Sequence, residues 1–290
     1  MSRDTGLVLY DATAEIAAAP VIRRYSNSFR MAASLFPRRT RGAIGSIYAL
    51  VRVADEIVDG TAEEAGLDRT ARGQRLDELE AEVARAIATG FSANLIVHAF
   101  ANVARRSGMA PEPIADFFSS MRRDLDPVAF DAVEYQTYIR GSAEAVGLMC
   151  LAVFLQDRET PAEDLAALEA GAARLGAAFQ KVNFLRDLGH DADRLGRAYL
   201  PGMEATGLSD VAKADVITDI RADLDAARAA IPKLPRDTRR AVRVATGIFA
   251  ELLRRLDRLP AERVASARVS VPAVAKLMIA TRCTLLPGRP

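Results

Sequence analysis

The chain has 290 residues, of which 50% are hydrophobic and 27% charged, so it carries enough apolar material for a sizeable folded core. Its formal net charge of +1 gives no overall attraction to the polyanionic backbone of nucleic acid, and no nucleic-acid partner is expected. The two cysteines make no disulfide framework and fit a reduced, cytoplasmic setting.

Helical periodicity runs along almost the whole chain, because apolar residues recur every three or four positions. The pattern predicts helices over 12–33, 40–60, 68–89, 92–108, 112–123, 131–155, 162–190, 208–231, 236–258 and 270–284. Proline and glycine separate them, for example at Phe36-Pro37 and at Leu200-Pro201-Gly202. Strand patterns are scarce and no linker divides the chain, so we expect an all-α protein with one domain over 1–290.

Membrane-crossing segments are not expected from the sequence. The start of the chain lacks the apolar stretch of a signal peptide. The longest apolar run covers residues 145–155, about eleven residues, whereas a spanning helix needs roughly twenty. A peripheral membrane contact remains compatible with the sequence.

The segment 41–59, RGAIGSIYALVRVADEIVD, is apolar on nearly every face, as is typical of a buried helix. It nevertheless carries Tyr48, Arg52, Asp55 and Asp59. At about 100° per residue these positions fall at roughly 0°, 40°, −20° and 20° around the helix axis. They therefore form one narrow polar stripe.

The segment 172–191, AARLGAAFQKVNFLRDLGHD, has the same character. Its polar positions are Gln180, Asn183, Asp187 and Asp191, which fall at roughly 0°, −60°, −20° and 20°. This second stripe again ends in Asp-x-x-x-Asp, with the two aspartates about 6 Å apart along the axis.

A buried carboxylate is costly unless it is paired or binds a cation. If the two stripes face each other, Arg52 alone cannot neutralise four aspartates, and the remaining charge must come from metal ions. Oxygen ligands suit Mg²⁺, with Mn²⁺ as an alternative, and Mg²⁺ often shares its shell with substrate phosphates. One Asp-x-x-x-Asp on a helix is usually a solvated face, but two on apolar helices favour a metal–diphosphate site.

Several blocks of the sequence resemble the squalene/phytoene synthase family of head-to-head prenyl transferases, in particular bacterial phytoene synthases. They are YSNSF at 25–29, YALVRVADEIVD at 48–59, YIRGSAEAVGLM at 138–149, FQKVNFLRDLGHDADRLGRAYLP at 179–201 and RVSVPAVAKL at 268–277. The resemblance implies an isoprenoid-synthase-type helical bundle around a central apolar cavity.

The resemblance also implies roles for individual residues. Metal ligands would be Asp55, Asp59, Asn183, Asp187 and Asp191. Catalytic residues would be Arg52 and Arg186, which hold diphosphate oxygens, and Tyr48 and Tyr138, which face the carbocation. Substrate would also contact Ser26, Ser28, Phe29, Gln180, Asn183, Arg197 and Tyr199.

The implied reaction condenses two geranylgeranyl diphosphates to phytoene through prephytoene diphosphate, with Mg²⁺. The alternative is the condensation of two farnesyl diphosphates to presqualene diphosphate, squalene or dehydrosqualene, and NADPH would be needed only for a reductive last step. A non-catalytic helical subunit is a third hypothesis, which the intact acidic motifs disfavour.

The chain departs from the common family pattern at four positions: Tyr25, Asn27, Ala33 and Glu56. Tyr25 takes a position that is often histidine, Asn27 replaces a frequent lysine, and Glu56 follows Asp55 where aspartate is common. Ala33 replaces an aromatic found in some relatives, which would leave room for a longer prenyl chain.

Overall fold

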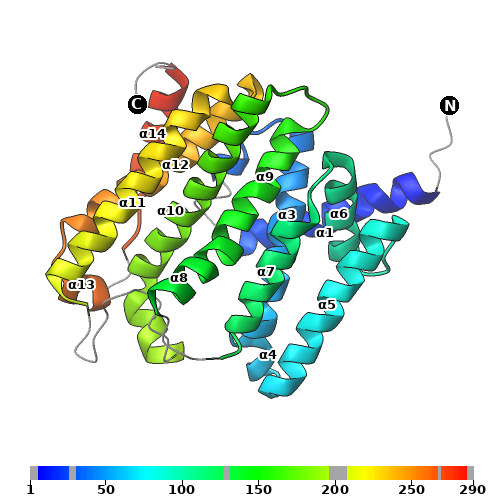
Figure 1. The fold of residues 1–290 in the computed structure, drawn as a ribbon, viewed down its shortest axis with the longest axis horizontal. Coiled ribbons are helices and arrows are strands. Elements are labelled where there is room, and N and C mark those ends of the chain that lie inside the picture. The colour runs from blue at the N-terminus through cyan, green and yellow to red at the C-terminus, as the bar shows by residue number, and fades with distance from the viewer. Residues whose placement is uncertain (1–5, 26–30, 127–130, 196–207, 267–268, 286–290) are drawn as a thin grey trace. The chain divides into compact units, whose positions relative to one another are not determined.

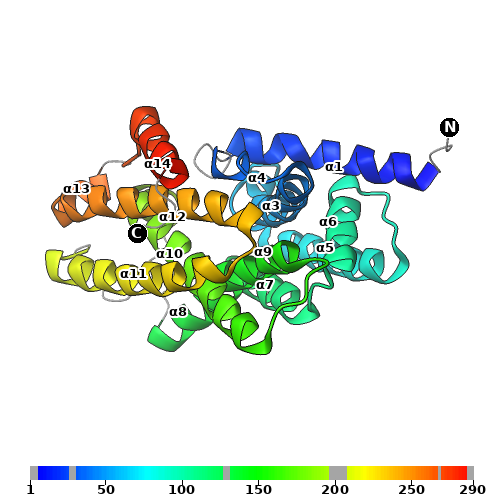
Figure 2. The ribbon, with the colours of Figure 1, turned by 90° about the horizontal axis from the view of Figure 1, so that it is seen from above.

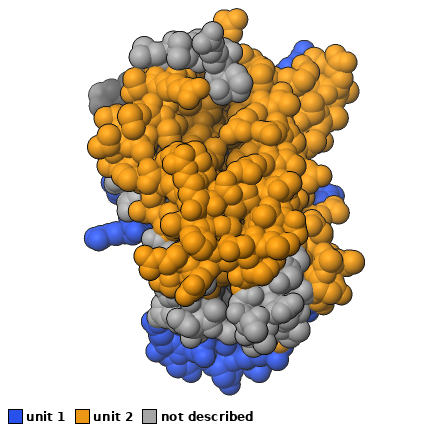
Figure 3. Space-filling view, turned by 90° about the vertical axis from the view of Figure 1, so that its left-hand side faces the viewer, with its two compact units in different colours: residues 1–125, 149–160 blue, residues 126–148, 161–290 orange. Residues whose placement is uncertain are grey.

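The computed structural model describes residues 6–25, 31–126, 131–195, 208–266 and 269–285, apart from the side chains of residues 189–195, 265 and 285. Within these ranges every regular element is a helix, which confirms the predicted all-α class (Figure 1). The chain divides into two compact units, coloured separately in Figure 3. Unit 1 comprises residues 1–125 and 149–160, and unit 2 comprises 126–148 and 161–290. The single domain over 1–290 stays a prediction.

Unit 1 is organised around α3 (Arg38–Val58). Its other helices are α1 (Gly6–Tyr25), α4 (Thr61–Glu64), α5 (Arg69–Thr89), α6 (Leu95–Ser107) and α7 (Pro111–Arg123). All five pack against α3. Where α1, α3 and α6 meet, Ala14, Ala18, Ala49 and Ala99 form a buried cluster whose small side chains let the helix backbones come close.

Unit 2 is organised around the 34-residue helix α10 (Ala162–Leu195). Around it lie α8 (Ala132–Ile139), the π-helical η1 (Arg140–Glu144), α11 (Asp210–Ala230), the 3₁₀ turn η2 (Ile231–Lys233), α12 (Arg236–Asp257), α13 (Ala261–Ser266) and α14 (Ala273–Leu285). Helix α14 packs against α12, and Figures 1 and 2 show it beside that helix. Helix α9 (Ala145–Leu155) starts in unit 2 and passes into unit 1 at Met149.

Two glycines allow the helix backbones to touch inside unit 2. A Cβ at Gly176 of α10 would lie 2.2 Å from the carbonyl oxygen of Ala143 in η1, and one at Gly147 would lie 2.3 Å from that of Ala172. Both distances are far below van der Waals contact, so any side chain would push the helices apart. The contact fixes α10 just before its predicted polar stripe.

Helix ends follow local capping chemistry. The side chains of Asp68, Asn94 and Ser209 accept hydrogen bonds from backbone N–H groups in the first turns of α5, α6 and α11. Gly90 and Gly108 end α5 and α6 in the left-handed conformation. These residues explain why most predicted helices are confirmed to within a few residues.

The predicted helices differ from the structure in three respects. The first helix begins at Gly6 rather than at residue 12, and the short helices α4 and α13 were not predicted. The segment predicted as one helix over 131–155 contains the π-helical turn η1, close to the Gly176 contact. Such turns accommodate one extra residue and are common near functional sites.

The helical stretch Ala132–Leu155 differs from the sequence expectation about membrane spans. Taken through the π turn, it has 24 residues, and an 18-residue window within it has a mean hydropathy of 1.4, so by length and composition it could cross a membrane. Core helices of soluble proteins pass the same test, and Tyr135, Tyr138, Ile139 and Met149 are buried in this protein. These residues favour a core helix.

Candidate functional site

The first acidic motif lies on the last turns of α3 in unit 1. Tyr48, Arg52 and Asp55 are partly buried, and Asp59 is exposed as the residue that ends the helix. The backbone N–H of Asp59 donates to the carbonyl oxygen of Asp55 at 2.7 Å. Ala54 and Val58 are buried whereas Tyr48, Arg52 and Asp55 keep part of their surface exposed, so unit 1 covers this end of the helix only in part.

Asp55 lies in a negative environment. Burial raises the pKa of Asp55 well above its usual range, and the charges of Asp59, Asp124 and Glu56 raise it further, while Arg52 opposes them. Asp124, the buried residue that ends α7, is thus a third aspartate close to the motif. The negative charges around Asp55 outweigh the charge of Arg52, and a bound cation would offset them.

Arg52 is held in place by its neighbour Glu56. Its Nε donates to Oε1 of Glu56 at 2.7 Å, and its Nη2 donates to the same oxygen. Nη1 lies 3.9 Å from Oδ2 of Asp55. The guanidinium carbon also lies 4.4 Å from the centre of the Tyr25 ring, a cation–π contact.

Glu56 accepts hydrogen bonds from several neighbouring side chains. The Thr61 hydroxyl donates to Oε2 of Glu56. Burial alone would raise the pKa of Glu56, but hydrogen bonds from Thr61, Arg52 and Tyr25 and the charge of Arg52 outweigh it and lower the pKa. Glu56 is therefore a stable anion that fixes Arg52 and also accepts a hydrogen bond from Tyr25.

The second acidic motif lies on α10 in unit 2. Gln180, Asn183, Arg186 and Asp187 are all partly buried. Arg186 Nε donates to Oδ1 of Asp187 at 2.9 Å, and its Nη2 donates to Oδ2, so Arg186 occupies both carboxylate oxygens. Residue 191 is helical, but the side chain of Asp191 lies outside the description.

The remaining predicted site residues divide into two groups. Tyr138 is buried, and its ring stacks on Phe184 of α10 with centroids 6.1 Å apart. This contact places a tyrosine ring beside the turn of α10 that carries Asn183 and Asp187. Five predicted substrate residues, Ser26, Ser28, Phe29, Arg197 and Tyr199, lie outside the described residues.

A third Asp-x-x-x-Asp pair, Asp219 and Asp223 on α11, was missed in the sequence. Lys181 Nζ lies 2.5 Å from Oδ2 of Asp219 and 2.7 Å from Oδ2 of Asp223, and Arg174 Nη1 lies 3.0 Å from Oδ1 of Asp223. Two cations thus neutralise two aspartates. This pair is structural, whereas at Asp55 burial and the charges of neighbouring carboxylates raise the pKa.

His98 and Cys150 have structural roles. His98 is fully buried, contacts Asp11 through Nε2 at 2.8 Å, and accepts the backbone N–H of Ser92 at Nδ1. Burial raises the pKa of Cys150 to about 12, which leaves an unreactive thiol. Among the side chains that the structure describes, no three His, Cys, Asp or Glu residues are arranged to hold a metal ion.

Comparisons with known proteins agree with these motifs. The sequence model of the squalene/phytoene synthase family matches residues 22–275. Phytoene synthase 3 of Zea mays is 34% identical over 209 residues, which cover 68% of this chain and 44% of that protein. Phytoene synthase of Thermus thermophilus is 32% identical over 190 residues, 62% of this chain and 57% of that protein.

The chain therefore spans only about half the length of these relatives.

Two solved structures share the fold of this chain. A dehydrosqualene synthase has a TM-score of 0.80 at 22% identity, over 96% of this chain and 98% of that one. The squalene synthase HpnC of Alicyclobacillus acidocaldarius has a TM-score of 0.71 at 22% identity, over 87% and 97%. The extent of the family match shows that this chain belongs to the squalene/phytoene synthase family.

Proposed function

We propose that this chain joins two prenyl diphosphates head to head, with two geranylgeranyl diphosphates as substrates and phytoene as product. The observation that carries the proposal is the negative environment of Asp55 and Asp59 beside a fixed arginine, on a chain of this family. Relatives named phytoene synthase, at 32% and 34% identity, support the choice of substrate. The solved neighbours, named dehydrosqualene and squalene synthase, favour two farnesyl diphosphates as the second candidate.

Mg²⁺ fits the residues present, because burial and the charges of Asp59, Asp124 and Glu56 raise the pKa of Asp55 in spite of Arg52. Asp55 and Asp59 would hold it at one motif, and Asn183, Asp187 and Asp191 at the other. Mn²⁺ would accept the same oxygen ligands. When bound, such an ion supplies charge neutralisation for the departing diphosphate.

The arginines of the two motifs would bind diphosphate oxygens. Arg52 is already oriented by Glu56 and Tyr25, so its guanidinium loses little freedom on binding. Arg186 now pairs with Asp187 and would exchange this carboxylate for a diphosphate oxygen when the carboxylate binds a cation. The two arginines therefore differ in how far they are organised before substrate arrives.

The aromatic residues would stabilise positive charge on carbon. The first C–O bond breaks to give an allylic cation and diphosphate, and the double bond of the second chain attacks C1 of this cation. Loss of a proton then gives a cyclopropylcarbinyl diphosphate. A second ionisation, rearrangement and proton loss give the hydrocarbon. Tyr48, Tyr138 and the neighbouring Phe184 supply ring faces and exclude water.

The deciding experiment incubates the purified protein with each prenyl diphosphate and Mg²⁺, with and without NADPH, and identifies the hydrocarbons. A C40 product with a central triene supports two geranylgeranyl diphosphates. A C30 product supports two farnesyl diphosphates, and its dependence on NADPH separates squalene from dehydrosqualene. Absence of diphosphate release from either substrate would defeat the proposal.

We also propose that the protein is cytoplasmic and contacts the membrane peripherally.

A further inference from the structure

The turn that follows α3 brings the short helix α4 against the first acidic motif. Gly60 has a φ of 105°, a left-handed conformation that favours glycine, and it lets the chain turn after Asp59. Helix α4 then begins at Thr61 and packs against α3. The side chain of Thr61 therefore meets that of Glu56, five residues earlier in the chain.

The hydroxyl of Thr61 contacts Glu56 and does not cap its own helix. Gly60 precedes α4 as its N-cap residue, and no side chain caps the helix. The Thr61 hydroxyl donates to Oε2 of Glu56, while Oε1 of the same carboxylate accepts from Arg52. Each carboxylate oxygen has its own donor, so the orientation of the carboxylate is fixed from both ends.

The contact from Thr61 acts strongly on Glu56. Burial raises the pKa of Glu56, and among the contributions that lower it the hydrogen bond from Thr61 comes first, ahead of that from Arg52. Thr61 itself is exposed. Since exposed side chains contribute little to stability, the consequence of this contact lies in how it orients Glu56.

Helix α4 is held in place from α5. Arg72 Nη1 donates to the carbonyl oxygen of Val58 at 3.3 Å and lies 3.2 Å from Oε2 of Glu63. The Arg72 side chain keeps only 12% of its surface exposed. One largely buried guanidinium thus links the end of α3 to α4, and this link keeps Thr61 within reach of Glu56.

We propose that Thr61 is a positioning residue for Arg52, on which it acts through Glu56. The hydroxyl orients the carboxylate, and the carboxylate orients the guanidinium toward the diphosphate oxygens before substrate arrives. Thr61 needs no contact with substrate for this role. The inference rests on the proposed binding of diphosphate by Arg52.

Calorimetry with inorganic diphosphate and Mg²⁺ tests the inference without turnover, because diphosphate is the group that the proposed reaction releases. Thr61→Val nearly keeps the side-chain shape but removes the hydroxyl, and it should weaken binding by about threefold to tenfold. Thr61→Ser keeps the hydroxyl and should bind like the parent. The matched control Thr13→Val removes an exposed hydroxyl that donates to the carbonyl oxygen of Leu9 within α1, and it should also bind like the parent.

A double-mutant cycle separates positioning from a merely structural role. Glu56→Ala removes the group through which Thr61 acts. Adding Thr61→Val to Glu56→Ala should therefore weaken binding by less than about a further twofold. A threonine that only supports the fold would weaken binding by the same factor in both backgrounds, and that result would overturn the inference.

Arg52→Ala distinguishes failure of this inference from failure of the proposed function. If Arg52→Ala weakens binding and Thr61→Val does not, Thr61 does not position Arg52. If Arg52→Ala binds as tightly as the parent, the proposed role of Arg52 is wrong, and the role of Thr61 is wrong with it. A parent protein that does not bind diphosphate in the presence of Mg²⁺ would contradict the proposed function itself.

Discussion

Lys181 and Asp223 form a buried ion pair between α10 and α11, in which Nζ lies 2.7 Å from Oδ2 and each side chain keeps only 2% of its surface exposed. Lys181 lies on α10 between Gln180 and Asn183 but points to another face, about 100° from Gln180 and 200° from Asn183. The pair therefore sets the rotation of α10 about its axis, and with it the direction of the polar stripe.

Lys181→Met should destabilise the protein by about 3 kcal/mol, because Asp223 keeps only the exposed Arg174 as a partner. The double variant Lys181→Met/Asp223→Leu should recover most of this loss, since no unpaired buried charge remains. The control is Arg75→Gln, which breaks an exposed pair with Glu78 and should cost below about 1 kcal/mol. Urea unfolding measures the free energy of unfolding of all three variants. Equal losses for Lys181→Met and Arg75→Gln would show that the buried pair of Lys181 and Asp223 stabilises the protein no more than a surface pair does.

The acidic stripes were predictable because helical periodicity alone places Asp55 and Asp59 on one side of an apolar helix. The same arithmetic cannot separate them from Asp219 and Asp223, which have identical spacing. The difference lies in Lys181, which is 38 residues away from Asp219 and meets it only through the packing of α10 on α11. The contact of Arg52 with Glu56 follows from i,i+4 spacing, but the contact with Tyr25 required the fold of unit 1.

Asp55→Asn should make the metal-free protein more stable, by about 1 kcal/mol, because it removes a charge that its neighbours repel. The same change should abolish the rise in melting temperature that Mg²⁺ and a diphosphate analogue give to the parent, as should Asp187→Ala. Asp225→Asn, at an exposed pair with Arg228, serves as the matched control and should keep the rise. If Mg²⁺ and the diphosphate analogue do not raise the melting temperature of the parent protein, the proposed metal–diphosphate site is wrong.

Glu56→Gln should lower kcat by about tenfold to a hundredfold and change KM less, because Arg52 keeps its charge but loses the anion that orients it. Steady-state kinetics with the active prenyl diphosphate gives both constants. Glu78→Gln changes an exposed glutamate of α5 that pairs with Arg75 and should leave both constants unchanged. An unaltered kcat in Glu56→Gln would show that the position of Arg52 does not limit the reaction.

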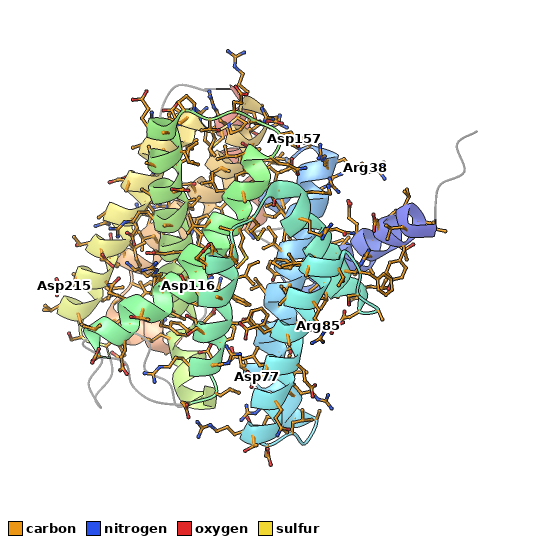
Figure 4. The ribbon with its side chains drawn as sticks, turned by 45° about the vertical axis from the view of Figure 1, so that its right-hand side comes forward. Arg38, Asp77, Arg85, Asp116, Asp157 and Asp215 are labelled. Carbon is orange, nitrogen blue, oxygen red and sulfur yellow. The ribbon has the colours of Figure 1, made fainter. Side chains whose placement is uncertain are left out.

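Arg39 and Asp157 offer a test of surface pairing near the start of α3. Arg39 Nη2 lies 3.1 Å from Oδ2 of Asp157, and Figure 4 shows Asp157 near Arg38, the first residue of that helix. Both side chains are mostly exposed, so Asp157→Asn should change stability by less than about 1 kcal/mol. Asp157 also has a positive φ of 60°, which asparagine tolerates about as well as aspartate, whereas Asp157→Val should cost more. Thermal unfolding distinguishes the two, and equal melting temperatures would argue against backbone strain.

Gly176→Ala should destabilise the protein by about 3 kcal/mol or more, because its Cβ would lie 2.2 Å from the carbonyl oxygen of Ala143 and no flexible side chain can yield. Gly45→Ala is the matched control in α3: its Cβ would meet nothing within 4 Å, so helix propensity should make it neutral or stabilising by up to about 1 kcal/mol. Urea midpoints compare the two. If Gly176→Ala unfolds at the same urea concentration as the parent, α10 and η1 are not in direct backbone contact.

The contact between α10 and η1 at Gly176 also lies near the second acidic motif. It is about 16 Å from Asp187 along the helix axis, at 1.5 Å per residue. A displacement there would reach the turn that we propose to bind metal, so Gly176→Ala should also weaken the Mg²⁺-dependent rise in melting temperature, which Gly45→Ala should leave intact.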